Sequence, residues 1–94
     1  MSERHVRRRV RVEGRVQGVF FRGATQEQAR RFGVCGWVRN RADGSVEAVI
    51  EGPEPAVEAL LGFVAHGPPG ARVDRMESSA ETPLEGFEAF EVRR

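Results

Sequence analysis

Apolar and polar residues alternate along the first part of the chain. From His5 to Glu13, valines fall on one face of an extended segment, while arginines and a final glutamate fall on the other. This period of two is typical of a half-buried β-strand, because successive side chains point to opposite faces of a sheet. Arg8 is the residue that breaks the alternation. The apolar face of the predicted strand consists of Val6, Val10 and Val12.

A loop and then a helical pattern follow this strand. The segment from Gly14 to Val19 begins with a glycine and holds a second one, Gly18, and it predicts a loop. From about Phe21 to Phe32 the apolar residues recur at helical spacing. Gly33 then stands at the C′ position, where a left-handed residue commonly ends a helix. The predicted inner face of this helix is Phe21, Ala24, Gln28 or Ala29, and Phe32.

Two further strands are predicted on either side of a tight turn. Val34 to Arg41 and Ser45 to Glu51 both have strand patterns, and Asp43-Gly44 lies between them. Asp-Gly is a strong hairpin signal, because a type I′ turn needs positive φ at both of its central residues. The sequence therefore predicts a β-hairpin with a type I′ turn at this point.

The second half of the chain predicts one more helix and two more strands. Pro53 opens the helix, and Gly67-Pro68-Pro69 ends it. Arg72 to Ala80 predicts a fourth strand, and Phe87 to Val92 a short final one. The apolar stripe of the helix follows the i, i+3, i+4, i+7 template and consists of Val57, Leu60, Leu61 and Val64.

The elements come in the order βαββαβ with a short terminal strand. This order predicts a ferredoxin-like α+β sandwich, an antiparallel sheet with two helices on one face, in a single domain spanning residues 1–94. A right-handed crossover makes strands one and two parallel, with strand three between them. The Gly14–Val19 loop and Asn40 therefore lie at the same edge of the sheet. Pleat parity turns Asn40 towards the helix-covered face.

The most informative polar residue is Arg22, which falls in the first turn of the predicted first helix. A helix N-terminus carries roughly +0.5 elementary charge, so a cation there is opposed by about 0.3–1 kcal/mol. A bound anion reverses the sign, because free backbone N–H groups, the helix dipole and the guanidinium can all converge on it. The opening of the chain therefore predicts an anion cradle, with phosphate as the anion.

Composition narrows the class of protein without choosing a function. The 94 residues carry a formal net charge of +1, and all 15 basic residues are arginine, so the overall charge gives no reason to expect a polyanionic partner. Cys35 is the only cysteine, which excludes an intramolecular disulfide and favours a reducing compartment. The opening segment MSERHVRRRVRV lacks the apolar run of a signal peptide, and no window approaches a transmembrane helix. We expect a cytoplasmic protein.

Two motifs resemble a known family. The runs GRVQGVFFR at 14–22 and GWVRN at 36–40, followed by DG-S-V-E, closely resemble the acylphosphatase family. The likeness covers nearly the whole chain, through the FEAFEV ending. It implies an enzyme that hydrolyses the carboxyl–phosphate bond of acyl phosphates, giving a carboxylate and inorganic phosphate. It also implies that the reaction needs neither a metal nor an organic cofactor.

The resemblance further implies roles for individual residues. Arg22 falls on the family's phosphate-binding arginine, and Asn40 on the asparagine that orients the attacking water. The implied partner is a small-molecule acyl phosphate, with phosphate or sulfate as an inhibitor. We expect a monomer that binds neither nucleic acid nor membranes. The residues that fall on the loop whose backbone amides hold the phosphate are Arg15, Val16, Gln17, Gly18 and Val19.

Two other site chemistries have weaker support. Cys35 to Arg41 fits the Cys-x5-Arg spacing of cysteine-dependent phosphatases. Such a cysteine needs a loop that leads into a helix N-terminus to stabilise its thiolate, whereas Cys35 follows a predicted helix end and enters a strand. His5 and His66 have no cysteine or histidine at ligand spacing, which argues against a metal site.

A nucleic-acid-binding module is the alternative from a different functional class. The run RHVRRRVRVEGRV is a basic stripe, and RNA-recognition motifs share the βαββαβ order. That module stacks bases on aromatic residues of its central strands, and the first and third predicted strands have none. The third strand also carries Glu47 and Glu51. A ligand-sensing or interaction domain without catalytic activity is the other alternative that stays open.

Overall fold

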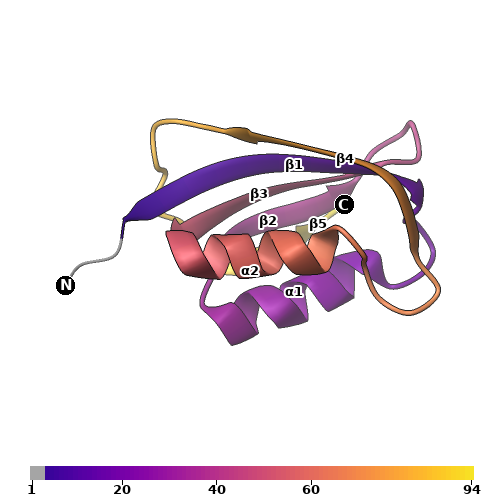
Figure 1. Cartoon of the computed structure of the whole chain (residues 1–94), viewed down its shortest axis with the longest axis horizontal. Helices are drawn as coiled ribbons and strands as arrows, with labels where there is room; N and C mark the ends of the chain where they lie inside the picture. Colours follow the sequence, from indigo (N-terminus) through magenta and orange to yellow (C-terminus); the bar gives the residue numbers. More distant parts are fainter. Residues whose placement is uncertain (1–3) are drawn as a thin grey trace.

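The fold is a two-layer arrangement of one sheet and two helices (Figure 1). The structure is a computed structural model that describes residues 4–94. The opening segment, for which the sequence predicts no signal peptide, begins with residues 1–3, and these three lie outside the described residues. In chain order the elements are β1 (His5–Arg15), α1 (Phe21–Phe32), β2 (Cys35–Asn40), β3 (Val46–Pro53), α2 (Glu54–Val64), β4 (Arg72–Ala80) and β5 (Phe90–Arg93).

The five strands form one sheet in the order β4-β1-β3-β2-β5. β3 lies between β1 and β2 and is antiparallel to both, so β1 and β2 run parallel, as the right-handed crossover predicts. The predicted ferredoxin-like α+β class is confirmed. One correction concerns β5, which pairs with β2 in parallel and makes the sheet mixed instead of purely antiparallel. The chain reaches this edge by crossing from β4 at the opposite edge, so no hairpin joins β5 to its neighbour.

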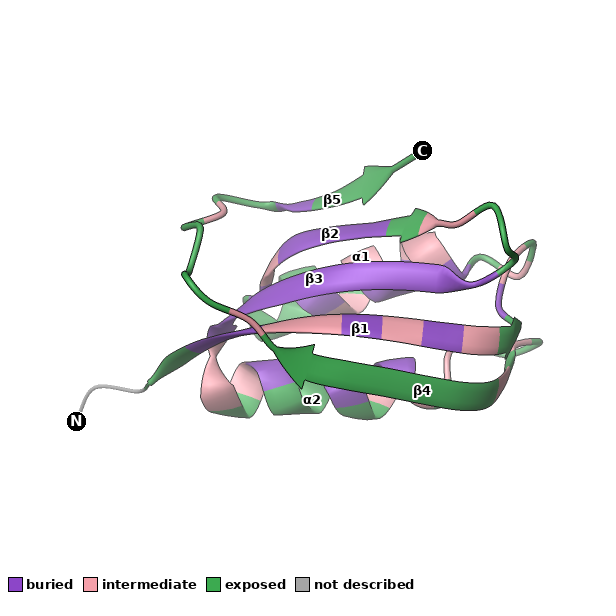
Figure 2. Cartoon of the chain, turned by 90° about the horizontal axis from the view of Figure 1, so that it is seen from above, coloured by how far each residue is buried: buried purple, intermediate pink, exposed green. Residues whose placement is uncertain are grey.

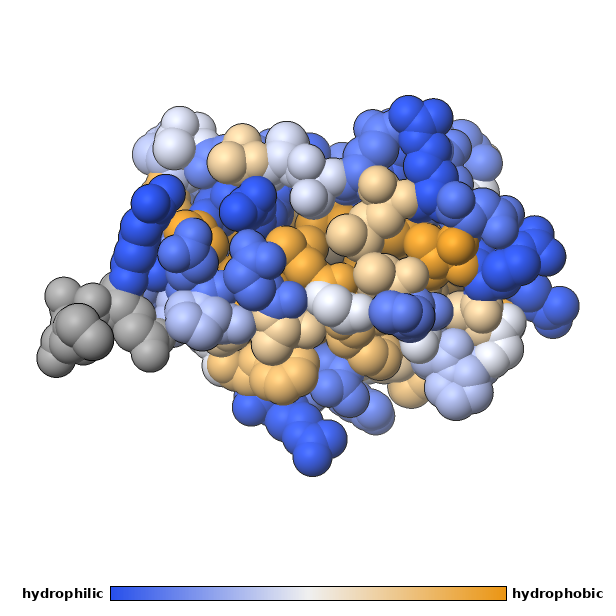
Figure 3. Space-filling model, in the orientation of Figure 1, coloured by the Kyte–Doolittle hydropathy of each residue, from blue (hydrophilic) through white to orange (hydrophobic). Residues whose placement is uncertain are grey.

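The hydrophobic core lies between the sheet and the helices. Figure 3 shows hydrophobic residues along the middle of one side of the molecule, with hydrophilic residues towards its margins. Figure 2 shows that the central strand β3 is buried along its length, whereas the edge strand β4 is exposed. The largest apolar side chains that are fully buried are Ile50, Leu60, Val10, Val12, Val16, Val38, Val49 and Val57.

The helices form where the periodicity predicts them. α1 has the predicted bounds and ends at Gly33 in the left-handed conformation, and all four predicted apolar residues of α2 are buried. On α1, Phe32 was predicted to face the core, and this prediction is wrong because its position in the last residue of the helix leaves it 36% exposed. Thr25 is buried instead. Its hydroxyl donates to the Phe21 carbonyl at 2.8 Å, which satisfies the polar group inside the core.

The first strand is longer than its alternation predicts. β1 continues to Arg15 beside β4, through a shift in register between Glu13 and Gly14. Arg8, which breaks the alternation, reaches Glu58 of α2 at 3.4 Å on the helix-covered side. The loop that leads to α1 is therefore confined to residues 16–20. Among residues 4–94, neither helix has the length and the apolar run that crossing a bilayer requires.

Candidate active site

One cavity of about 630 Å³ opens at the edge of the sheet where β1 and β2 end. This volume lies within the range of about 300–1,000 Å³ that is usual for small-molecule sites. From the loop and the first turn of α1, the cavity is lined by Val16, Gly18, Phe20, Phe21, Arg22 and Gly23. Asn40, Val92 and Arg94 complete its wall. The parallel arrangement of β1 and β2 thus brings Arg22 and Asn40 to one cavity.

The loop and the start of α1 present a row of backbone donors. In the described part of the chain, the N–H groups of residues 17–20 donate to no protein acceptor. The first helical hydrogen bond after the loop runs from Ala24 N–H to the Phe20 carbonyl at 3.0 Å. The N–H groups of helical residues 21–23 therefore have no acceptor within the helix. No side chain caps α1, and its first turn holds no acidic residue. These donors stand at the positive end of the helix dipole.

Two residues of the loop have left-handed backbone conformations. Gly18 has a φ of 75° and Phe20 a φ of 63°. Glycine adopts this region readily, and a Cβ at Gly18 would meet no atom within 4 Å, so backbone conformation alone is the reason for glycine there. Successive residues that alternate in this way turn their N–H groups towards a common centre, as in anion-binding nests.

Arg22 differs from most arginines of the chain in its partner. Its Nη1 donates to the carbonyl of Arg93 in β5 at 3.3 Å. Within residues 4–94 it forms no salt bridge with a carboxylate. The guanidinium is therefore positioned by a neutral group, and no carboxylate of the described residues neutralises its charge.

Asn40 is the last residue of β2 and pairs with Val46 of β3. Its side chain is half-buried and lines the same cavity as Arg22. The carboxamide offers an acceptor oxygen and a two-hydrogen donor nitrogen, and it carries no charge that would repel a phosphate.

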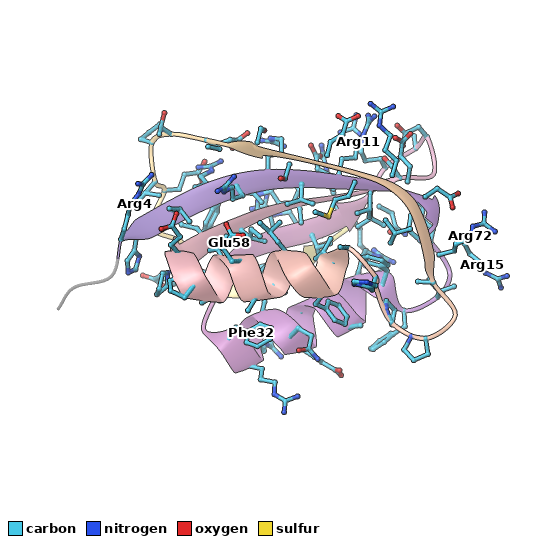
Figure 4. All side chains as sticks on the ribbon, viewed as in Figure 1. Arg4, Arg11, Arg15, Phe32, Glu58 and Arg72 are labelled. Carbon is cyan, nitrogen blue, oxygen red and sulfur yellow. The ribbon has the colours of Figure 1, made fainter. Side chains whose placement is uncertain are left out.

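The remaining residues of the predicted cradle do not line the cavity with their side chains. Arg15 extends away from the fold beside Arg72, its neighbour in register on β4 (Figure 4). Val19 is partly buried and packs against the core. The Gln17 carboxamide turns to the β2–β3 hairpin, where Nε2 donates to the carbonyls of Arg41 at 2.8 Å and Ser45 at 2.9 Å. Gln17 thus ties the loop to the strand end that carries Asn40.

The β2–β3 hairpin forms as predicted, but with a different turn. Of Asp43 and Gly44, only Gly44 has a positive φ, so the predicted type I′ turn is wrong. The Arg41 N–H donates to the Ser45 carbonyl at 2.8 Å, which closes a three-residue loop. The Asp43 carboxylate accepts hydrogen bonds from the Ser45 hydroxyl at 2.6 Å and the Ser45 N–H at 2.9 Å, and these bonds lower the pKa of Asp43. This acceptor explains why Asp43 needs no left-handed conformation.

Comparisons with known proteins agree with this fold and site. The family model of acylphosphatase matches residues 8–92. An acylphosphatase of Thermococcus kodakarensis is 55% identical over 89 residues, which cover 95% of this chain and 97% of that protein. The crystal structure of acylphosphatase from Bacillus subtilis superposes with a TM-score of 0.91 at 38% identity, covering 95% of this chain and 99% of the other.

The chain belongs to the acylphosphatase family. Its activity is the hydrolysis of acyl phosphates to a carboxylate and inorganic phosphate. An acylphosphatase of Natronomonas pharaonis is also 49% identical over 94 residues, the full length of both chains. The substrate is accordingly a small-molecule acyl phosphate.

Some residues that line this acylphosphatase cavity were not predicted from the sequence. Phe20 lies between the loop and the helix, outside the pattern of either, and only its exposure in the structure distinguishes it. Val92 and Arg94 reach the cavity because β5 pairs with β2, a pairing that no turn signal announces. Gly23 could have been noticed as a glycine in the first turn of a helix, where the residue has a low intrinsic propensity.

The Cys-x5-Arg interpretation has no geometric support. Cys35 begins strand β2, and the Arg41 guanidinium donates to the Glu47 carboxylate at 3.1 Å. The two residues thus frame a strand and not a phosphate loop. No group of three or more histidine, cysteine, aspartate or glutamate residues lies together as a metal site would require, in so far as residues 4–94 are described.

Proposed function

We propose that the loop amides of Arg15 to Val19 and the Arg22 guanidinium hold the phosphate of an acyl phosphate, while Asn40 orients the attacking water. The observation that carries this proposal is the single cavity lined by the loop, Arg22 and Asn40. Arg22 and Asn40 come from different elements, and each is free of a competing carboxylate partner among the described residues.

The phosphate is bound by donors that are in place before it arrives. Loop N–H groups surround the oxygens, and the α1 dipole adds its positive end. The guanidinium can contact two oxygens at once, a geometry that an ammonium cannot offer. Phosphoryl transfer depends mainly on positioning and on stabilising the charge of the transferred group, so a cradle of this kind supplies most of the catalysis.

Asn40 acts on the nucleophile. Its carboxamide holds a water in line with the phosphorus–oxygen bond to the acyl group. The water oxygen bonds to phosphorus, the bond to the acyl oxygen breaks, and the carboxylate leaves with the electron pair. A carboxylate is a good leaving group, so no general acid is required. The substrate phosphate accepts the proton of the water, because no side chain in the cavity is placed as a general base.

The test separates phosphate binding from turnover. Asn40→Ala should lower kcat for acetyl phosphate by about 10²-fold, the effect of losing the alignment of a reacting group. The inhibition constant of inorganic phosphate should stay close to the wild-type value, because Asn40 acts on the water and not on the anion. A variant that keeps its kcat while its affinity for phosphate collapses would place Asn40 in the phosphate cradle and refute this assignment.

The same assay tests the absence of metal chemistry. Phosphate release by the wild-type enzyme should be unchanged in excess EDTA, since we propose a site made of amides, one guanidinium and one carboxamide. Loss of activity in EDTA, restored by a divalent cation, would contradict this. We further propose that the enzyme acts as a cytoplasmic monomer on a soluble substrate, with phosphate and sulfate as competitive inhibitors and without nucleic acid or membrane partners.

A further inference from the structure

Phe20 is an unusual residue at the mouth of the cavity. Its side chain is 66% exposed, the largest exposure among the large hydrophobic residues that the structure describes. It also has a φ of 63°, a left-handed conformation that is rare and costly for a bulky residue. An aromatic residue that is both exposed and held in such a conformation calls for a functional explanation.

The position of the Phe20 ring is fixed by Gly23. A Cβ built on Gly23 would lie 2.3 Å from Cε1 and 2.4 Å from Cζ of the ring. The ring therefore rests directly on the backbone of the first turn of α1, and only glycine leaves room for it. This support explains a glycine at a helical position where alanine would have the higher propensity. Phe20 lines the same cavity as Arg22.

Other apolar side chains also line this cavity. Val92 of β5 is 37% exposed and lines the cavity, as do the buried Val16 and Phe21. The cavity thus has a cationic part, made of Arg22, Arg94 and the loop amides, and an apolar part, which includes Phe20 and Val92. A phosphate group alone would use only the first part.

We propose that Phe20 and Val92 form an acyl-group subsite, and that Phe20 makes the enzyme favour acyl phosphates with aromatic or bulky apolar acyl groups. The inference rests on the proposed function, because it takes the phosphate to lie at Arg22. With the phosphate there, the acyl group extends towards the mouth of the cavity. A ring face at the mouth stacks on an aromatic acyl group and removes apolar surface from water, but gains little from an acetyl group.

The test compares kcat/KM for benzoyl phosphate and for acetyl phosphate in the same variants. Phe20→Ala should lower the ratio of the two values by roughly two- to ten-fold, the usual scale of one aromatic pair. The intrinsic reactivity of the two substrates cancels, since each variant is compared with the wild type. The matched control is Phe32→Ala, which removes an exposed phenylalanine at the other end of α1 (Figure 4) and should leave the ratio unchanged.

Gly23→Ala tests the role of the Phe20 ring in a second, independent way. The added methyl group displaces the ring while the residue at position 20 and its backbone stay as they are. This variant should also lower the benzoyl-to-acetyl ratio, but not in a Phe20→Ala background, where there is no ring to displace. A ratio that stays at the wild-type value in both Phe20→Ala and Gly23→Ala would overturn the subsite. A further fall in the double variant would show that Gly23 acts through the helix and would overturn it as well.

The inhibition constant of inorganic phosphate separates this proposal from the proposed function. Phosphate has no acyl group, so its affinity should be unchanged in Phe20→Ala. Weaker phosphate binding, with an equal loss of kcat/KM for both substrates, would show that Phe20 holds the loop and does not select the acyl group. A failure of the roles assigned to Arg22 and Asn40 would be seen in their own variants, whatever Phe20 does.

Discussion

Arginines on two surfaces of this acylphosphatase differ in their hydrogen-bond partners. On the sheet face that the helices leave open, Arg9, Arg39 and Arg41 all donate to the Glu47 carboxylate, at 2.7, 2.9 and 3.1 Å. At the cavity, Arg22 contacts only a backbone carbonyl among the described residues. The residue type is the same, and the difference lies in whether a carboxylate is within reach.

This difference supports the role proposed for Arg22, one of the 15 arginines of the chain, in binding the substrate phosphate. A guanidinium that already shares a carboxylate has its charge largely neutralised, and it attracts a further anion weakly. The basic stripe of β1 is mostly of this kind, because Arg7 and Arg9 both contact Glu81. The charge pattern of the sequence therefore overstates the basic character of the open face, whereas the lone cation in the first turn of α1 lines the cavity of the proposed site.

The open face also has a structural use for its arginines. Trp37 lies on this face, only 7% exposed, and three guanidinium groups stand 4.9–5.8 Å from the centre of its ring. Arginine stems cover the indole and keep their charged ends with carboxylates. Trp37 is thereby packed, and it is not available as a base-stacking platform.

The comparison predicts its largest effect for the removal of Arg22. Arg22→Ala should lower kcat/KM for acetyl phosphate by about 10²–10³-fold, the usual loss when one preorganised donor to the transition state is deleted. Arg9→Ala removes an arginine of the open face and should leave the activity of the folded enzyme near that of the wild type. Steady-state kinetics of both variants, with circular dichroism to check folding, make the measurement.

A lysine at position 22 sharpens the result. Arg22→Lys keeps the charge but should recover little activity, because an ammonium cannot contact two phosphate oxygens in one plane. Near-wild-type kinetics in either variant at position 22, or a similar loss in Arg9→Ala, would remove the distinction between the two surfaces.

The juxtaposition of Arg22 and Asn40 could be predicted from sequence because it depends on topology. The order of elements and the handedness of the crossover bring the ends of β1 and β2 together without any knowledge of packing. The bounds of α1 were equally predictable, since its apolar spacing and the Gly33 cap agree. These features depend on local patterns and on general rules of chain connection.

Other features depend on contacts between distant residues that leave no local pattern. The side-chain hydrogen bonds of Gln17 join residues more than 20 positions apart. β5 follows an irregular segment, so nothing in the sequence indicates that it pairs with β2. Phe20 precedes the helix and falls outside its periodicity, and the Glu47 carboxylate accepts hydrogen bonds from arginines up to 38 positions away.

The stabilisation that inorganic phosphate gives should also depend on which arginine is removed, Arg22 at the cavity or Arg9 on the open face. Inorganic phosphate at about 100 times its Kd should stabilise the wild type by about 2.7 kcal/mol, which corresponds to a rise in Tm of roughly 10–20 °C. The salt also acts generally, as an ion excluded from the protein surface. Arg22→Ala keeps this general effect and should lose the specific one, whereas Arg9→Ala should keep both. Equal rises in Tm in wild type and Arg22→Ala would show that Arg22 does not bind the anion.

The last expected effect concerns Glu47, whose carboxylate accepts hydrogen bonds from three arginines of the open face. Its side chain is 7% exposed, and hydrogen bonds to charged groups contribute about 1.5–3 kcal/mol. Glu47→Gln should therefore lower the free energy of unfolding at pH 7 by about that amount. The activity of the folded variant should stay close to that of the wild type, because Glu47 does not line the catalytic cavity. Urea unfolding and steady-state kinetics measure the two effects.

The effect of Glu47→Gln should also depend on pH. Burial alone would raise the pKa of Glu47, but hydrogen bonds from Arg39 and Arg9 outweigh it, and the pKa lies below its ordinary value of 4.5. A carboxylate with a lowered pKa stabilises the fold above the unfolded-state pKa, and this stabilisation is lost as the pH falls through the folded-state value. The difference in stability between wild type and Glu47→Gln should therefore be constant near neutrality and shrink below about pH 4.5. If the difference grew as the pH fell, the arginines would not be held by an ionised carboxylate, and the contrast with Arg22 would lose its physical basis.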